Sequence, residues 1–270
     1  VEIFLDEILP SGLAEEIAVE GRYAALRHVQ GTLRIQAVAV LSDRIVVTVE
    51  PVPDGTVSLR DVLAFAATNG APAGPAFASG LIEALSHVLQ TMHSTAGQRA
   101  HGLLSPDAVL VDRSGGIKLI GPGLPWLNRL IIPPAAHEEE LLRVIAPEAL
   151  RGEPIDARAD VYSLAVLTYE LMSGVAYRDQ MPAAALRDAA QHGLLPGLPG
   201  RLKNPKPPLI ALLERGLQPS AARRFPTVLA FSEALRSALG PAAVGEPIQS
   251  RLARLVSKPS VPPARKGVAV

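Results

Sequence analysis

Cysteine is absent from this chain of 270 residues. Its absence excludes disulfides, thiolate catalysis and cysteine-based metal sites. The formal net charge is zero, so electrostatics favours neither nucleic acid nor an acidic membrane as the main partner. The sequence has no run of about eighteen apolar residues and no signal-peptide pattern, and it therefore predicts a cytoplasmic domain without a membrane segment.

Hydrophobic residues make up 48% of the chain, enough to bury the core of one globular unit. Residues 1–9 and 34–52 are rich in Val, Ile and Leu and are bounded by Pro or Gly, which predicts strands. Between them, Leu13–His28 has the apolar spacing of a helix. Beyond residue 58, helices are predicted over Leu59–Ala67, Pro75–His93, Asp160–Ser173 and Pro226–Leu239. The breaker-rich residues 193–208 are predicted to form a loop.

Residues 101–123 read HGLLSPDAVLVDRSGGIKLIGPG. They resemble the catalytic core of protein kinases, in which H-R-D-L-K-P-x-N is followed by two strands and by D-F-G. His101, Leu104 and Pro106 keep the frame of this motif. The residues that would contact substrate, phosphate or metal are replaced. Leu103 occupies the position of the catalytic Asp and Ser105 that of the Lys, while Ala108 and Gly121 occupy the positions of the metal-binding Asn and Asp.

Five further segments resemble the same family, in the same order along the chain. Ala146-Pro147-Glu148 matches the A-P-E motif, and Asp156–Gly174 is similar to the central helix of the large lobe. Pro219–Thr227 carries Arg224 where the family has the arginine that pairs with the A-P-E glutamate. Upstream, Leu26–His28 resembles the end of the family's C helix and Val46–Gly55 resembles the hinge. The resemblance is to bacterial serine/threonine kinases in particular.

The resemblance implies an α+β, two-lobed, protein-kinase-like fold. Residues 1–55 would form a truncated N-terminal β lobe and residues 56–240 a mainly α-helical C-terminal lobe. Residues 241–270, basic and rich in proline, are predicted to be disordered. Residues 1–55 leave no room for a glycine-rich loop, which only residues upstream of Val1 could restore. They also lack the family's lysine, because the first lysine in the chain is Lys118. Val19 stands where the C helix carries its glutamate, so the family's Lys–Glu ion pair cannot form.

These replacements predict a catalytically inactive domain, a pseudokinase. Loss of a general base alone typically lowers a rate by about 10²–10⁴-fold, and here the metal ligands and both lysines are replaced as well. We expect no bound metal, no cofactor and no residual ATP binding, because Mg²⁺ would lack hard oxygen ligands. Two carboxylates lie nearby in the sequence: we expect Asp107 to face solvent and Asp112 to begin a turn, so neither compensates for the losses.

The implied function is a protein-binding or regulatory scaffold in signalling, whose protein partner the sequence does not name. One alternative is a serine/threonine kinase, or another ATP-dependent phosphotransferase on this fold, with relocated catalytic residues. Another is a part of a larger receptor or signalling protein.

Several motif residues are predicted to be structural. We expect His101 to be a packed core histidine and Asp160 to accept hydrogen bonds from the backbone of the catalytic loop. Glu148 and Arg224 are expected to form a buried ion pair.

Two further segments contain residue types that occur in binding sites. Val49, Glu50 and Val52 at the hinge, with Leu110 as an apolar floor, keep the groups that would hold an adenine ring, as any chain in this fold does. His137–Glu140 is expected to be a solvated segment and not a metal site, since the histidines show no H-x-x-x-H spacing.

Overall fold

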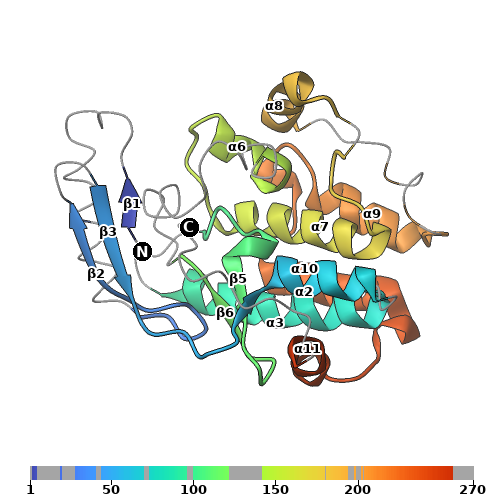
Figure 1. Ribbon diagram of the computed structural model, residues 1–270. Helices are drawn as coiled ribbons and strands as arrows, with labels where there is room; N and C mark the ends of the chain where they lie inside the picture. Colours follow the sequence, from blue (N-terminus) through green and yellow to red (C-terminus); the bar gives the residue numbers. More distant parts are fainter. Residues whose placement is uncertain are drawn as a thin grey trace.

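A sheet of three antiparallel strands forms one end of the molecule (Figure 1). The computed structural model describes residues 2–4, 19, 28–40, 44–69, 73–95, 100–121, 142–179, 181–193, 198, 202 and 204–257. The strands are β1 (Glu2–Phe4), β2 (Ile35–Val40) and β3 (Arg44–Val49), in the order β1-β3-β2. They lie inside the two segments predicted as strands. The predicted helix Leu13–His28 falls outside the described residues except for Val19 and His28.

A second antiparallel sheet lies between the first sheet and the helices (Figure 1). It contains β4 (Val57–Ser58), β5 (Val109–Val111) and β6 (Ile117–Leu119). The β5–β6 turn is closed by Asp112, whose Oδ1 accepts hydrogen bonds from the backbone nitrogens of Ser114 at 2.7 Å and Gly116 at 2.9 Å. Aspartate often stabilises turns in this way. The predicted turn role of Asp112 is therefore confirmed.

The remaining described residues are mainly helical. The α-helices before residue 240 are α2 (Leu59–Thr68), α3 (Pro75–Ser94), α6 (Pro147–Leu150), α7 (Ala157–Ser173), α8 (Ala183–His192), α9 (Pro207–Gly216) and α10 (Val228–Leu239). Short 3₁₀ turns are η1 (Pro106–Ala108), η4 (Ala221–Arg223) and η5 (Gly240–Ala243). Ser58 caps α2 by accepting a hydrogen bond from the backbone nitrogen of Asp61.

The core is built around α7, which α3, α9 and α10 contact (Figure 1). The side chains of α7 are buried on nearly every face from Ala159 to Tyr169, as expected of a helix that is apolar all round. α3 contributes Leu81, Ile82, Leu85 and Leu89, each with no exposed surface. The structure thus confirms a large helical lobe beside a small β lobe. No helix in the described ranges has the length and apolar character needed to cross a membrane.

The prediction of disorder from residue 241 was wrong for residues 241–257. The helix α11 (Ile248–Val256) packs against α2 and α3. Its apolar residues recur with helical spacing and bury Leu252, Leu255 and Val256 in the main core. The basic and proline-rich composition of the tail hid this spacing. The predicted loop 193–208 extends slightly too far, because Pro207 and Pro208 begin α9.

Candidate functional site

The segment that resembles the catalytic loop is held in place by Asp160, from the first turn of α7. The Asp160 carboxylate accepts hydrogen bonds at 2.8 Å from the backbone nitrogens of His101 and Gly102. His93, in the last turn of α3, also contacts it, with Nε2 2.7 Å from Oδ2. Asp160 is fully buried. Its predicted role, acceptor for the loop backbone, is present in the structure, and His93 is an additional partner that the sequence did not reveal.

His101 is a buried structural histidine, as predicted. Its side chain is enclosed, with the whole residue 3% exposed. Nε2 lies 2.7 Å from the carbonyl oxygen of Ile120 and must donate to it, because a carbonyl only accepts. Nδ1 accepts a hydrogen bond from the backbone nitrogen of Leu103. Burial lowers the pKa of His101 below its usual value, although the nearby Asp160 opposes this. Both ring nitrogens are therefore committed within the protein.

The four replaced positions carry no ionisable group. Leu103 and Gly121 are buried, while Ser105 and Ala108 are partly buried. The backbone nitrogen of Ala108 donates to the carbonyl oxygen of Ser105 at 3.0 Å and closes the η1 turn. These residues keep the shape of a loop. None of them has a carboxylate that could coordinate a metal or accept a substrate proton.

The nearby carboxylates are bonded elsewhere. Asp107 was expected to face solvent, and 39% of its side chain is exposed, but both of its carboxylate oxygens also accept from Arg60 Nε at 2.8 Å. Arg60 comes from α2, which is distant in the sequence, so no local pattern indicated the pair. Asp112 is held inside its turn. Within the described ranges, no cluster of three or more His, Asp or Glu side chains is arranged to hold a metal ion.

One hinge residue, Glu50, links the two sheets. Leu110 on β5 pairs with Lys118 on β6, and paired residues in antiparallel strands share one face of the sheet. The Lys118 ammonium contacts the Glu50 carboxylate, just after β3. Val49 is partly buried and Val52 is exposed. The structure thus places Glu50 near the β5–β6 strand pair that contains Leu110. The contact is made by Lys118, which the sequence did not assign to the hinge.

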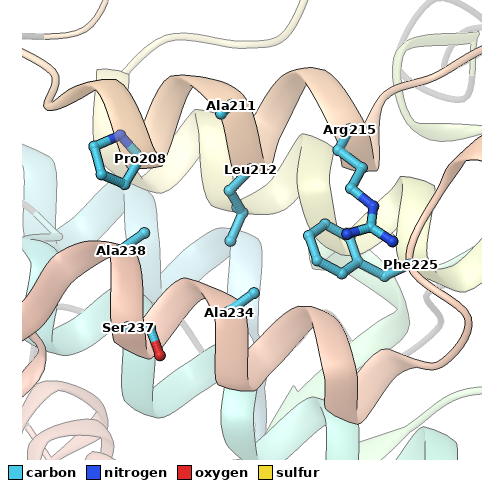
Figure 2. A pocket seen from close by; sticks show the side chains of 8 residues that line it. All are labelled: Pro208, Ala211, Leu212, Arg215, Phe225, Ala234, Ser237 and Ala238. Atoms are coloured by element: carbon cyan, nitrogen blue, oxygen red, sulfur yellow. The ribbon is translucent and has the colours of Figure 1, made fainter.

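Two open cavities in the described part of the chain lie away from the replaced positions. One is a groove of about 370 Å³ between α9 and α10, lined mostly by apolar and small side chains (Figure 2). In it, the Arg215 guanidinium lies over the Phe225 ring, 4.2 Å from its centre. The other, of about 390 Å³, lies beside Glu148 and Pro219. Neither has a lining residue from the catalytic-loop segment.

Glu148 and Arg224 form the predicted buried ion pair. Two parallel contacts join them, Nη1 to Oε1 at 2.6 Å and Nη2 to Oε2 at 2.7 Å. The remaining guanidinium hydrogens are donated to the carbonyl oxygens of Gln218, Arg158 and Pro219. Both residues are at most 5% exposed. A buried pair with all donors satisfied holds α6 to the segment before α10, independently of any catalysis.

Arg178 is a second buried arginine, and the sequence gave no signal for it. It donates hydrogen bonds to the Tyr162 hydroxyl and to the carbonyl oxygens of Leu142 and Ala189. These contacts connect Leu142, which precedes α6, to α7 and α8. The segment His137–Glu140, predicted to be solvated, falls outside the described residues.

Known proteins similar to this chain are protein kinases. Pkn2 of Myxococcus xanthus, a serine/threonine-protein kinase, is 28% identical over 245 residues, which cover 84% of this chain and 28% of that protein. Integrin-linked protein kinase 1 of Arabidopsis thaliana is 31% identical over 140 residues, or 49% of this chain and 28% of that protein. The solved PknI kinase domain of Mycobacterium tuberculosis superimposes with a TM-score of 0.63 at 18% identity, covering 85% of this chain and 81% of that one.

This chain has the protein-kinase fold. No family model matches it. The resemblance of this kinase-like domain to the protein kinase superfamily, and to its bacterial serine/threonine members, is confirmed. The matches span between 12% and 28% of the length of these curated relatives. What those whole proteins do is therefore not transferred to it by similarity alone.

Proposed function

We propose that this kinase-like domain is a pseudokinase, a catalytically inactive scaffold that binds or regulates another protein in signalling. The observation that carries the proposal is the catalytic-loop segment itself. Leu103, Ala108 and Gly121 offer no side-chain oxygen to a proton or a metal ion, and the neighbouring Asp107 is paired with Arg60. Kinase catalysis depends mostly on positioning and electrostatic stabilisation of the phosphoryl group, and the groups that supply both are replaced.

The retained contacts support a structural role. Asp160 still fixes the loop backbone, and the Glu148–Arg224 pair is complete. A frame preserved without its catalytic side chains suits a surface presented to a protein partner. The names of the relatives favour the alternative, phosphotransfer by relocated residues, and the test below separates the two. The proposal includes a cytoplasmic location and no cofactor, both of which stay predictions from the sequence.

Thermal unfolding with and without Mg-ATP tests the proposal. A ligand at 100 times its Kd would stabilise the fold by about 2.7 kcal/mol, a shift that is easily measured. We expect millimolar Mg-ATP to leave the melting temperature unchanged, with or without EDTA. An active bacterial kinase domain serves as the positive control in the same assay.

Transfer of labelled phosphate to a generic substrate is measured in parallel. A metal-dependent shift together with phosphate transfer would overturn the pseudokinase proposal. A shift of the melting temperature that does not need metal, without phosphate transfer, would contradict the expectation that the domain binds no nucleotide. It would indicate a nucleotide-sensing module.

A further inference from the structure

An ion pair crosses from the small lobe to the β5–β6 hairpin. The Lys118 ammonium, from the middle of β6, contacts Glu50 Oε1 just beyond β3. The same carboxylate oxygen accepts a hydrogen bond from the backbone nitrogen of Arg34 at 3.3 Å. Contact with Lys118 lowers the pKa of Glu50, although burial opposes this, and His28 adds a smaller effect in the same direction. The carboxylate is thus held by one group from each side of the lobe boundary.

Backbone hydrogen bonds run beside this pair. The Leu33 nitrogen donates to the Leu119 carbonyl oxygen at 2.7 Å, and the Leu119 nitrogen donates to the Gly31 carbonyl oxygen at 2.9 Å. The Glu50 nitrogen donates to the Arg34 carbonyl oxygen at 2.9 Å. Residues 31–34 therefore join the two partners of the ion pair through the main chain. A Cβ added at Gly31 would lie 2.8 Å from a Val88 methyl of α3, so this segment also contacts the helical lobe closely.

We propose that the Glu50–Lys118 pair is an interlobe clasp that holds the small lobe in one position against the large lobe. In a catalytic kinase, the nucleotide and its metal ions touch groups from both lobes. Here the first lysine in the chain is bonded to the hinge carboxylate, and the protein itself supplies the connection. This inference goes beyond the proposed function, because an active or an inactive domain could contain such a clasp.

The exposure of the pair decides what should be measured. Lys118 is 42% exposed and Glu50 23% exposed. Ion pairs this accessible to water contribute little to global stability. Loss of the clasp should therefore change the position of the lobe more than the melting temperature.

The absence of cysteine makes a direct distance measurement possible. Thr48→Cys on β3 and Ser237→Cys on α10 place one spin label on each lobe, at exposed positions. The distance distribution between the labels is recorded by pulsed electron paramagnetic resonance. The test variants are Lys118→Gln and Glu50→Gln, together with the charge exchange Glu50→Lys/Lys118→Glu. The control is Arg60→Gln, which breaks the similarly exposed Arg60–Asp107 pair inside the large lobe.

We expect a narrow distribution of label distances for the native and Arg60→Gln proteins. Lys118→Gln and Glu50→Gln should each give a broader or shifted distribution, and the charge exchange should make it narrow again. Raising the salt to about 1 M, where the screening length falls to about 3 Å, should broaden the native distribution. Circular dichroism confirms that each variant is folded, and Lys118→Met, which also removes the charge, replaces Lys118→Gln if that variant does not fold. Single clasp variants with the native distribution would overturn the proposal.

Mg-ATP is added to the native labelled protein as a separate arm. An unchanged distribution supports a clasp that works without nucleotide. A distribution that narrows only with Mg-ATP would overturn the clasp. The melting experiment with Mg-ATP tests the pseudokinase proposal independently, so the two failures are distinguishable.

Discussion

The catalytic-loop segment and the Glu148–Arg224 region differ in what the chain has kept. In the loop, the side chains that would act on a phosphate are replaced, yet Asp160 still holds the backbone. Around Arg224, both the charges and the hydrogen bonds are complete. The frame of a kinase fold and its chemistry are thus physically separable. Groups that satisfy buried backbone atoms are needed for folding, whereas groups that face the substrate are not.

The largest effect is expected from breaking the buried pair. Glu148→Ala or Arg224→Ala leaves a buried charge without its partner, which typically costs about 3–5 kcal/mol in the free energy of unfolding. The double variant should lose less than the sum of the two single losses, because the residues interact directly. Chemical denaturation measures all three.

A matched control is available nearby. Arg151→Ala breaks an exposed contact with Glu153 and should cost at most about 1 kcal/mol. Additive losses for Glu148 and Arg224 would show that the two residues are not energetic partners.

Removal of a buried side chain from α11 should have the next largest effect. Leu252→Ala deletes atoms from the main core and is expected to lower the free energy of unfolding by about 2 kcal/mol or more. Gln249→Ala, at an exposed position of the same helix, should change it by less than about 0.5 kcal/mol. Equal, negligible effects of both substitutions would restore the original prediction of a disordered tail.

Local patterns in the sequence predicted much of the fold but few of the long-range contacts. The apolar faces of α3 and α7 and the Ser58 cap are encoded within single segments. The Glu148–Arg224 pair was predictable only because both residues sit in recognisable family motifs. Lys118–Glu50, His93–Asp160 and Arg60–Asp107 join residues 68, 67 and 47 positions apart, and nothing in their neighbouring residues indicates the partner. The helical spacing of α11 is short and lies within a basic, proline-rich tail, whose composition is typical of disorder.

The buried His101 should make stability depend on pH. Its pKa in the folded protein is lowered, mainly by burial, whereas in the unfolded chain it is about 6.5. Between these two values the unfolded state binds a proton that the folded state does not. The contribution of the neutral His101 to the free energy of unfolding is therefore complete above about pH 6.5. It is lost as the pH is lowered toward the folded pKa.

His101→Gln removes this titration and keeps a donor for the Ile120 carbonyl oxygen. The difference in free energy of unfolding between the native and His101→Gln proteins should therefore shrink as the pH falls from 7 to 5. His192→Gln, at an exposed position, is the control for the replacement of a histidine by glutamine. If the free energy of unfolding of His101→Gln fell with pH as steeply as that of the native protein, this histidine would not be the titrating group.

The smallest effect is expected from an attempt to restore the chemistry. Leu103→Asp, Ala108→Asn and Gly121→Asp together return the general base and the metal ligands of the resembling motif. We still expect no measurable transfer of labelled phosphate, because no lysine precedes Lys118 and Lys118 is bonded to Glu50. Catalytic groups that act as a unit give little when only some are present. Unfolding curves must show that the triple variant is folded. Metal-dependent phosphate transfer by that variant would place the loss in the loop alone and show that the rest of the domain had kept a working nucleotide site.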